Sequence, residues 1–84
     1  MIQKQIEVRI ENGLHARPAG ELVKLLKPYK STVHLVKDGK KFNMKSIIHI
    51  MSTSVKEGDL LHLEVDGEDE DEVAAKLASF FQQH

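Results

Sequence analysis

The hydrophobic pattern changes its period within residues 6–26. Ile6, Val8 and Ile10 recur at every second position, which is the spacing of a strand with one buried face. From residue 19 onward the apolar side chains recur at every third or fourth position, as on one face of a helix: Ala19, Leu22, Val23 and Leu26. The stretch between them, residues 13–19, reads Gly-Leu-His-Ala-Arg-Pro-Ala and therefore lies where a strand leads into a helix.

The start of this helix favours a bound anion, because its first turn has N–H groups without intrahelical partners and carries the positive end of the helix dipole. Pro18 suits this first turn. A backbone N–H there would have no helical partner, and proline has no N–H to leave unpaired. The imidazole of His15 can accept a phosphoryl group and pass it on, and the guanidinium of Arg17 can grip phosphate oxygens. The residues indicate a phosphorylatable histidine, although a histidine near a helix start is more often a cap or a surface residue.

The same seven residues resemble the active-site motif of HPr, the histidine-containing phosphocarrier family of the bacterial sugar phosphotransferase system. A second segment, residues 39–51, reads Gly-Lys-Lys-Phe-Asn-Met-Lys-Ser-Ile-Ile-His-Ile-Met. It is similar to the regulatory serine motif of that family, with Ser46 at the phosphorylated position. The resemblance runs the full length of the chain and includes the Gly-Glu-Asp-Glu run at residues 67–70.

Length and composition restrict the class of protein. A chain of 84 residues is long enough for one small core, so we expect residues 1–84 to form a single HPr-like domain. Twelve basic against thirteen acidic residues give no overall attraction to nucleic acid, and the absence of cysteine excludes disulfides and thiolate metal sites. The N-terminal residues alternate and form no apolar block, which predicts neither a signal peptide nor membrane insertion and favours a cytoplasmic location.

Periodicity predicts strands at residues 2–10, 31–37, 40–43 and 60–66, and helices at residues 16–27, after Ser46 and after Asp69. Asp38 and Gly39 are a strong signal for a two-residue hairpin turn. The acidic run at residues 68–72 is interpreted as a helix start capped by Asp69 and not as an acidic binding tail.

The element order is therefore βαββαβα, which by itself supports a sheet covered on one face by helices. The family resemblance implies the rest of the architecture. It implies an α+β open-faced β-sandwich in which three helices cover one face of a four-stranded antiparallel sheet in the order 1-4-2-3.

The resemblance implies a phosphocarrier that is a substrate of its partners and not an enzyme. In the family, His15 would accept phosphate from phosphoenolpyruvate-charged Enzyme I and donate it to enzyme IIA domains, while Arg17 steadies the phosphate. No cofactor or metal is expected, and no ligand role is given to the other histidines. We expect a partner-binding patch at Leu14, Ala16, Gly20, Ile47, Ile48 and Met51. In so short a helix, the last three of these are expected to divide between core and surface.

Ser46 has two interpretations. Its hydroxyl suits the N-cap of a short helix, where serine is common. The resemblance adds a regulatory role, in which the HPr serine kinase/phosphatase would phosphorylate Ser46 and change its recognition by Enzyme I and by the catabolite control protein. His49, three residues further on, replaces the usual glycine of the Gram-positive form and could respond to a phosphate on Ser46 by charge attraction.

Two other functions remain open at this point. One is an HPr paralogue that acts mainly as a Ser46-phosphorylated corepressor in carbon catabolite repression. The known paralogue of this kind in bacilli lacks the active-site histidine, so the presence of His15 favours the carrier. His49 and Thr53 depart from the usual pattern after the regulatory serine and keep the paralogue open as an alternative. The other is a carrier for a specialised, for example nitrogen-related, phosphotransferase branch. The sequence predicts neither the sugars served nor the oligomeric state.

Overall fold

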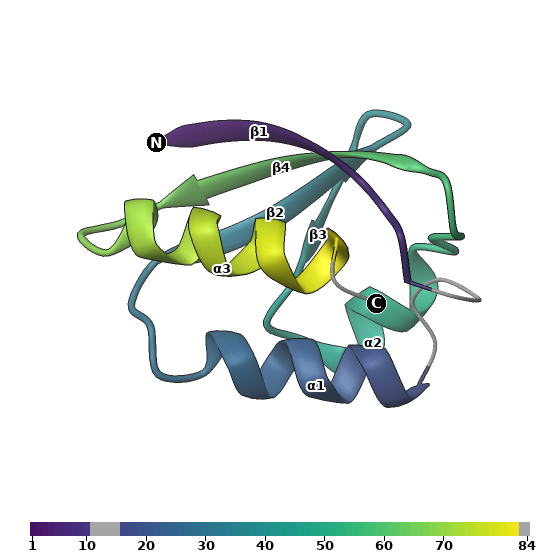
Figure 1. Ribbon diagram of the computed structural model, residues 1–84, viewed down its shortest axis with the longest axis horizontal. Helices are drawn as coiled ribbons and strands as arrows, with labels where there is room; N and C mark the ends of the chain where they lie inside the picture. The colour runs from purple at the N-terminus through teal and green to yellow at the C-terminus, as the bar shows by residue number, and fades with distance from the viewer. Residues whose placement is uncertain (11–15, 83–84) are drawn as a thin grey trace.

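The computed structural model describes residues 1–10 and 16–82 of the chain. Within them the elements are β1 (Ile2–Glu7), α1 (Ala16–Leu26), β2 (Thr32–Lys37), β3 (Lys40–Asn43), α2 (Ile47–Ser52), β4 (Leu60–Asp66) and α3 (Glu70–Gln82). The strands form one antiparallel sheet in the order β1-β4-β2-β3, and α1 and α3 lie side by side against one face of it (Figure 1). The predicted element order and strand order are confirmed.

The core lies between the sheet and the helices. Alternate residues of the two central strands point into it, which is the expected pattern for a sheet covered on one face. The buried residues of these two strands are Val33, Leu35, Leu61, Leu63 and Val65. The helices contribute the side chains that recur at helical spacing, namely Ala19, Leu22 and Leu26 from α1 and Val73, Leu77 and Phe81 from α3.

The first strand is shorter than the sequence predicts. Ladder pairing ends where Glu7 meets Leu60, the first residue of β4. Beyond it the backbone of Val8 bonds to the turn before β4, donating to the carbonyl of Asp59 at 2.9 Å, and Arg9 donates to the carbonyl of Phe81 at 2.8 Å. Val8 stays buried because this segment passes from the sheet to the end of α3, so hydrophobic alternation continues after the strand has ended.

The hairpin between β2 and β3 forms as predicted. Asp38 has a φ of 53° and Gly39 a φ of 78°, so both central residues adopt the left-handed conformation that a type I′ turn requires. Lys37 pairs with Lys40 across the turn. This places β3 at the edge of the sheet and directs the chain from Asn43 into α2.

The acidic run begins a helix, as predicted, but the side chain of Asp69 bonds to the segment before β2. Its carboxylate accepts backbone N–H bonds from Lys30 and Ser31, both at 2.9 Å, and a third bond from the Ser31 hydroxyl. The N–H of Gly67 donates to Glu70 at 3.3 Å. Asp69 therefore ties the segment before β2 to the start of α3.

Candidate functional site

Helix α1 begins at Ala16, immediately after His15 in the sequence. His15 and Leu14, the predicted phosphoacceptor and one predicted patch residue, lie outside the described residues. Ala16 and Arg17 are exposed in the first turn, and Pro18 occupies the third helical position, where its missing N–H costs no helical hydrogen bond. The helix is anchored by Ala19 and Leu22, which are fully buried beneath this exposed turn.

The Arg17 guanidinium points into solvent. Its side chain is 89% exposed, and its Nε lies 3.8 Å from Oε1 of Glu21, one helical turn further on. Such an exposed pair contributes little to stability, because water screens it and two long side chains must be ordered. An anion at the start of α1 can therefore compete with Glu21 for this guanidinium.

Ser46 is the N-cap of α2, as the sequence predicts. Its backbone is extended, with φ −114° and ψ 119°, and its hydroxyl oxygen accepts the N–H of His49 at 3.5 Å. The carbonyl of Ser46 accepts the N–H of Ile50 at 3.0 Å. The side chain of Lys45 donates to the carbonyl of Tyr29 at 2.7 Å, so the residue before the cap is joined to the chain just after α1.

The expected division of the α2 isoleucines and methionine between core and surface is wrong. Ile47, Ile48 and Met51 are 45%, 76% and 49% exposed, and the core position of this helix is taken by Ile50, which is fully buried. In a helix of only six residues that contacts α1 and β3, Ile50 takes the inward position, and the other three apolar side chains face outward. We call Ile47, Ile48 and Met51 the α2 patch.

The α2 patch adjoins the first half of α1. The two helices are in contact, and Figure 1 places α2 beside the N-terminal half of α1. A Cβ built on Gly20 would lie 4.0 Å from Cδ1 of Ile47, so the bare backbone at Gly20 lies beneath this isoleucine. The structure thus places Gly20, in the N-terminal half of α1, next to the α2 patch.

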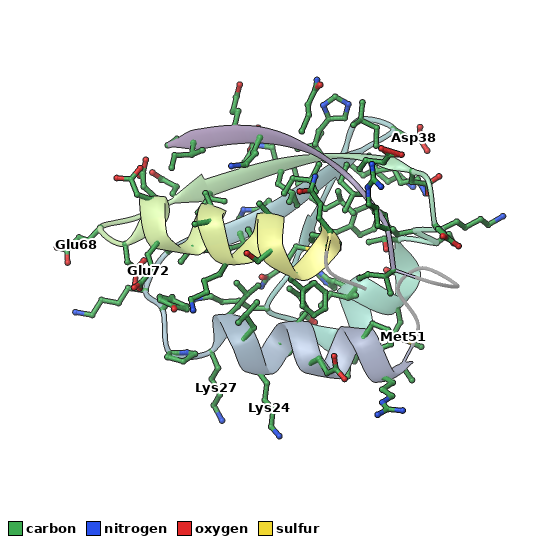
Figure 2. The ribbon with its side chains drawn as sticks, viewed as in Figure 1. Lys24, Lys27, Asp38, Met51, Glu68 and Glu72 are labelled. Carbon is green, nitrogen blue, oxygen red and sulfur yellow. The ribbon has the colours of Figure 1, made fainter. Side chains whose placement is uncertain are left out.

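Two lysines extend this surface along α1. Lys24 in α1 and Lys27, the first residue after it, are both exposed, and Figure 2 shows them projecting on the same side, away from the body of the molecule. Met51 of the α2 patch lies at the other end of that helix in the same view. The surface therefore combines apolar side chains with basic ones, a composition that suits partners with acidic surroundings to an apolar centre.

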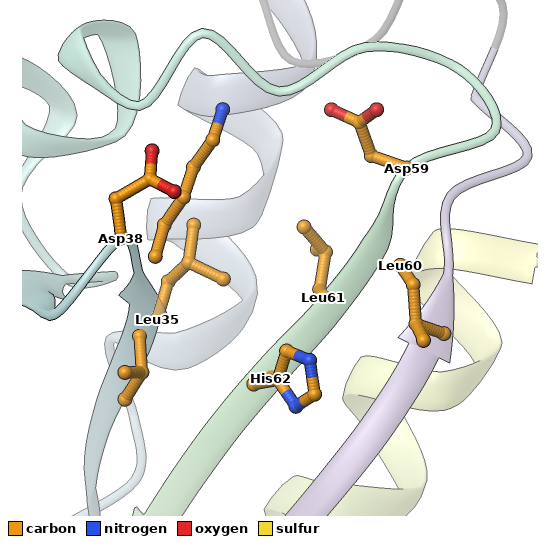
Figure 3. A pocket seen from close by; sticks show the side chains of 8 residues that line it. Leu35, Asp38, Asp59, Leu60, Leu61 and His62 are labelled. Atoms are coloured by element: carbon orange, nitrogen blue, oxygen red, sulfur yellow. The ribbon is translucent and has the colours of Figure 1, made fainter.

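One hollow of the sheet lies away from this surface. It has a volume of about 430 Å³ between β2 and β4, with Asp38 and Asp59 at its two sides (Figure 3). Its lining residues are Leu35, Val36, Lys37, Asp38, Asp59, Leu60, Leu61 and His62. None of them belongs to α1 or α2, so this hollow is separate from the predicted site.

Among residues 1–10 and 16–82, no three His, Cys, Asp or Glu side chains are arranged to hold a metal ion. The same residues include no helix of the length and apolar character needed to cross a membrane.

Comparison with known proteins decides the family. Residues 2–83 match the family model described as the PTS HPr component phosphorylation site. The chain belongs to the HPr family. It is 46% identical to the HPr-like protein Crh of Bacillus subtilis, over 99% of this chain and 98% of that protein. It is 35% identical to the phosphocarrier protein HPr of Buchnera aphidicola subsp. Acyrthosiphon pisum, over 93% of this chain and 92% of that protein.

Solved structures of the HPr family have the same fold. The phosphocarrier protein HPr from Bacillus anthracis superimposes with a TM-score of 0.90 at 36% identity, covering 96% of each chain. This agreement confirms the fold that the sequence resemblance implied. The family name covers both phosphocarriers and the HPr-like protein Crh, so the relatives support a phosphotransferase-system carrier or a Crh-like role.

The sequence patterns did not single out Asn43, which lies at the corner between β3 and α2. Asn43, interpreted only as the last residue of a strand, accepts the N–H of Lys45 on its side-chain oxygen at 2.9 Å and the N–H of Ser46 on its carbonyl at 3.1 Å. An asparagine whose side chain bonds the backbone two residues on is a known turn signal. That signal was present in Asn-Met-Lys-Ser, three residues before the N-cap.

Proposed function

We propose that this protein is a phosphoryl carrier of the sugar phosphotransferase system, with His15 as the acceptor. A ring nitrogen of His15 takes the phosphoryl group from phosphorylated Enzyme I and then gives it to an enzyme IIA domain. At each step one phosphorus bond forms as another breaks, so the protein ends unchanged. It acts in the cytoplasm, where both partners are expected to meet it.

One observation carries this proposal. The first turn of α1, which follows His15 directly, presents an exposed Arg17, and the α2 patch lies beside the N-terminal half of the same helix with three apolar side chains facing outward. Exposed apolar side chains gathered next to a charged site are typical of a surface that binds proteins. A carrier needs such a surface because its partners supply the catalytic groups.

Arg17 is proposed to hold the phosphoryl group on His15. Its guanidinium is almost fully exposed and is paired only weakly with Glu21, at 3.8 Å. A weak competing pair allows Arg17 to reach the phosphate without a large cost and to release it again. Reversible transfer requires this balance, since a deeply bound phosphohistidine would not pass its phosphate on.

Phosphorylation of Ser46 is proposed as the regulatory step. Ser46 borders the α2 patch directly, because Ile47 and Ile48 follow it in the sequence, and its side chain is partly exposed. A phosphate there would place two negative charges beside the surface used by Enzyme I. The HPr serine kinase/phosphatase and the catabolite control protein are the candidate partners of the modified form.

The second candidate function is a Crh-like regulator, and the 46% identity to the HPr-like protein Crh of Bacillus subtilis favours it. In that case the α2 patch and phosphorylated Ser46 would bind a catabolite control protein, and transfer through His15 would be secondary. The presence of His15 favours the carrier.

To test the proposal, the purified protein is incubated with Enzyme I and phosphoenolpyruvate, and the added phosphate is measured by mass spectrometry. We expect one acid-labile phosphate on the wild type and none on His15→Ala. A second incubation, with the HPr serine kinase and ATP, should add one acid-stable phosphate that Ser46→Ala abolishes. A folded wild type that gains only the acid-stable phosphate would make the regulator the main function.

A further inference from the structure

The corner between β3 and α2 is held by His49 as well as by Asn43. The N–H of Asn43 donates to Nδ1 of the His49 ring at 3.1 Å. The N–H of His49 in turn donates to the Ser46 hydroxyl oxygen at 3.5 Å. His49 therefore contacts the corner twice, through its ring at Asn43 and through its backbone at Ser46.

The position of β3 explains why the Asn43 N–H is available. β3 lies at the end of the strand order and pairs with β2. The next N–H, that of Met44, points to β2 and donates to the carbonyl of Val33 at 2.9 Å. Since successive N–H groups of a strand alternate in direction, the N–H of Asn43 points outward from the sheet edge. The His49 ring occupies that outward position and gives the edge group a partner.

This contact also determines where the ring carries its proton. A ring nitrogen that accepts a hydrogen bond is unprotonated, so the neutral imidazole of His49 has its proton on Nε2. Asn43, held at its N–H by His49, accepts the N–H of Ser46 on its carbonyl at 3.1 Å. A continuous set of hydrogen bonds thus runs from the ring of His49 through Asn43 to the backbone of Ser46.

We infer that His49 is a positioning residue for the Ser46 hydroxyl. Its ring fixes Asn43 at the sheet edge, Asn43 fixes the backbone of Ser46, and the hydroxyl is thereby presented at one defined place beside the α2 patch. The inference rests on the proposed modification of Ser46 and assigns to His49 the control of how readily that modification occurs.

Three substitutions of this exposed residue separate a positioning role from a general structural one. His49→Asn keeps an acceptor oxygen bonded to Cγ, where histidine has Nδ1. His49→Gln moves the acceptor one bond further from the backbone, and His49→Ala removes it. Asparagine and glutamine carry the same amide group, so a difference between them reports the position of the acceptor and not its chemistry.

The first readout uses the unmodified protein and needs no partner. Amide hydrogen exchange at Asn43 and Ser46 should be about fivefold faster in His49→Ala and His49→Gln, as expected for the loss of one hydrogen bond, and within about twofold of wild type in His49→Asn. Nitrogen chemical shifts of the wild-type ring should show the proton on Nε2. A proton on Nδ1, or equal exchange in all three variants, would overturn the inference.

The second readout is the rate at which the HPr serine kinase phosphorylates Ser46. We expect about a fivefold decrease in His49→Ala and His49→Gln, and recovery in His49→Asn. An unchanged rate in His49→Ala alongside faster exchange would show that the corner does not control the hydroxyl. If the wild type were not phosphorylated at all, the proposed modification would fail, and the exchange and ring data would still decide whether His49 holds the corner.

Discussion

Ser31 donates two hydrogen bonds to the carboxylate of Asp69, one from its N–H at 2.9 Å and one from its hydroxyl. The N–H of Lys30 adds a third, also at 2.9 Å. Ser31 is fully buried, and the contact joins the segment between α1 and β2 to the start of α3. These two distant parts of the chain are therefore held together by a negatively charged side chain.

The stability of the fold should consequently fall in acid. The hydrogen bonds from Ser31 and Lys30 hold the pKa of Asp69 below its ordinary value. A lowered pKa in the folded state means that the stabilisation is complete above the unfolded value, about 3.9, and is lost as the pH falls through the folded value. Thermal unfolding of Asp69→Asn should show a lower Tm at pH 7 and a smaller decrease between pH 5 and pH 3 than wild type.

Asp71→Asn is the matched control for this prediction. Asp71 is an exposed carboxylate in the first turn of α3, so its loss removes a similar charge from the same helix end. Circular dichroism melting curves of the two variants should differ. Identical dependence of Tm on pH in both would mean that the charge near the helix matters and the contact with Ser31 does not.

Gly67 is required by the same contact. A Cβ at this position would lie 2.6 Å from the Cα of Ser31, and Gly67 has a φ of 154°, which side-chain-bearing residues rarely adopt. Gly67→Ala should therefore destabilise the protein by about 3 kcal/mol or more in denaturant unfolding. The backbone at Ser31 would have to move away from the new Cβ, and residue 67 would hold a strained conformation.

Gly58→Ala separates backbone strain from steric conflict. Gly58 also has a positive φ, 92°, but a Cβ there would meet no atom within 4 Å. Its cost should be about 1–2 kcal/mol, the strain of the conformation alone. Equal costs for the two substitutions would show that Ser31 moves aside easily.

Local sequence signals were sufficient to predict the segments whose conformation depends only on neighbouring residues. The β2–β3 hairpin was predicted with its turn residues, because Asp38 and Gly39 tolerate positive φ irrespective of what surrounds them. The Ser46 cap was predicted for a similar reason, since its hydroxyl bonds the N–H of His49 only three residues on. The order of the strands in the sheet came from the family resemblance, because periodicity does not say which strands pair.

Contacts between distant segments could not be predicted from the pattern. Val8 alternates with Ile6 as a strand residue would, yet its backbone bonds to Asp59 and not to a β4 residue. The outward orientation of the α2 patch depends on how six helical residues rotate against α1 and β3, which a short apolar run does not specify. The contact between the Asn43 N–H and the ring of His49 depends on where α2 places that ring beside the sheet edge, which the local turn signal of Asn43 does not specify.

Replacing Gly20 should increase the stability of the protein, unlike replacing Gly67 or Gly58. It lies within α1, where glycine is unfavourable relative to alanine, and a Cβ there would make only an ordinary contact, 4.0 Å from Ile47. Gly20→Ala should therefore stabilise the protein by about 0.5–1 kcal/mol in urea unfolding. A loss of stability would mean that Ile47 approaches the helix more closely than the structure indicates.

Ile48 provides the most direct test of the α2 patch. It is 76% exposed and contributes little to the core, so Ile48→Asp should change the free energy of unfolding by no more than about 0.5 kcal/mol. If the patch binds Enzyme I, the same substitution should slow phosphate transfer to His15 by about fivefold or more, because it puts a charge into an apolar contact. Transfer is measured as the rate of acid-labile phosphate formation at limiting Enzyme I.

Leu60→Asp is the control, since Leu60 is also an exposed apolar residue, at 55%, but lies on β4 beside the separate hollow of the sheet. The charge introduced is the same, and so is the change in net charge of the protein. Transfer to this variant should therefore proceed at the wild-type rate. Slowing of both variants to the same extent would mean that Enzyme I responds to net charge alone, and the α2 patch would lose its assignment as the binding surface.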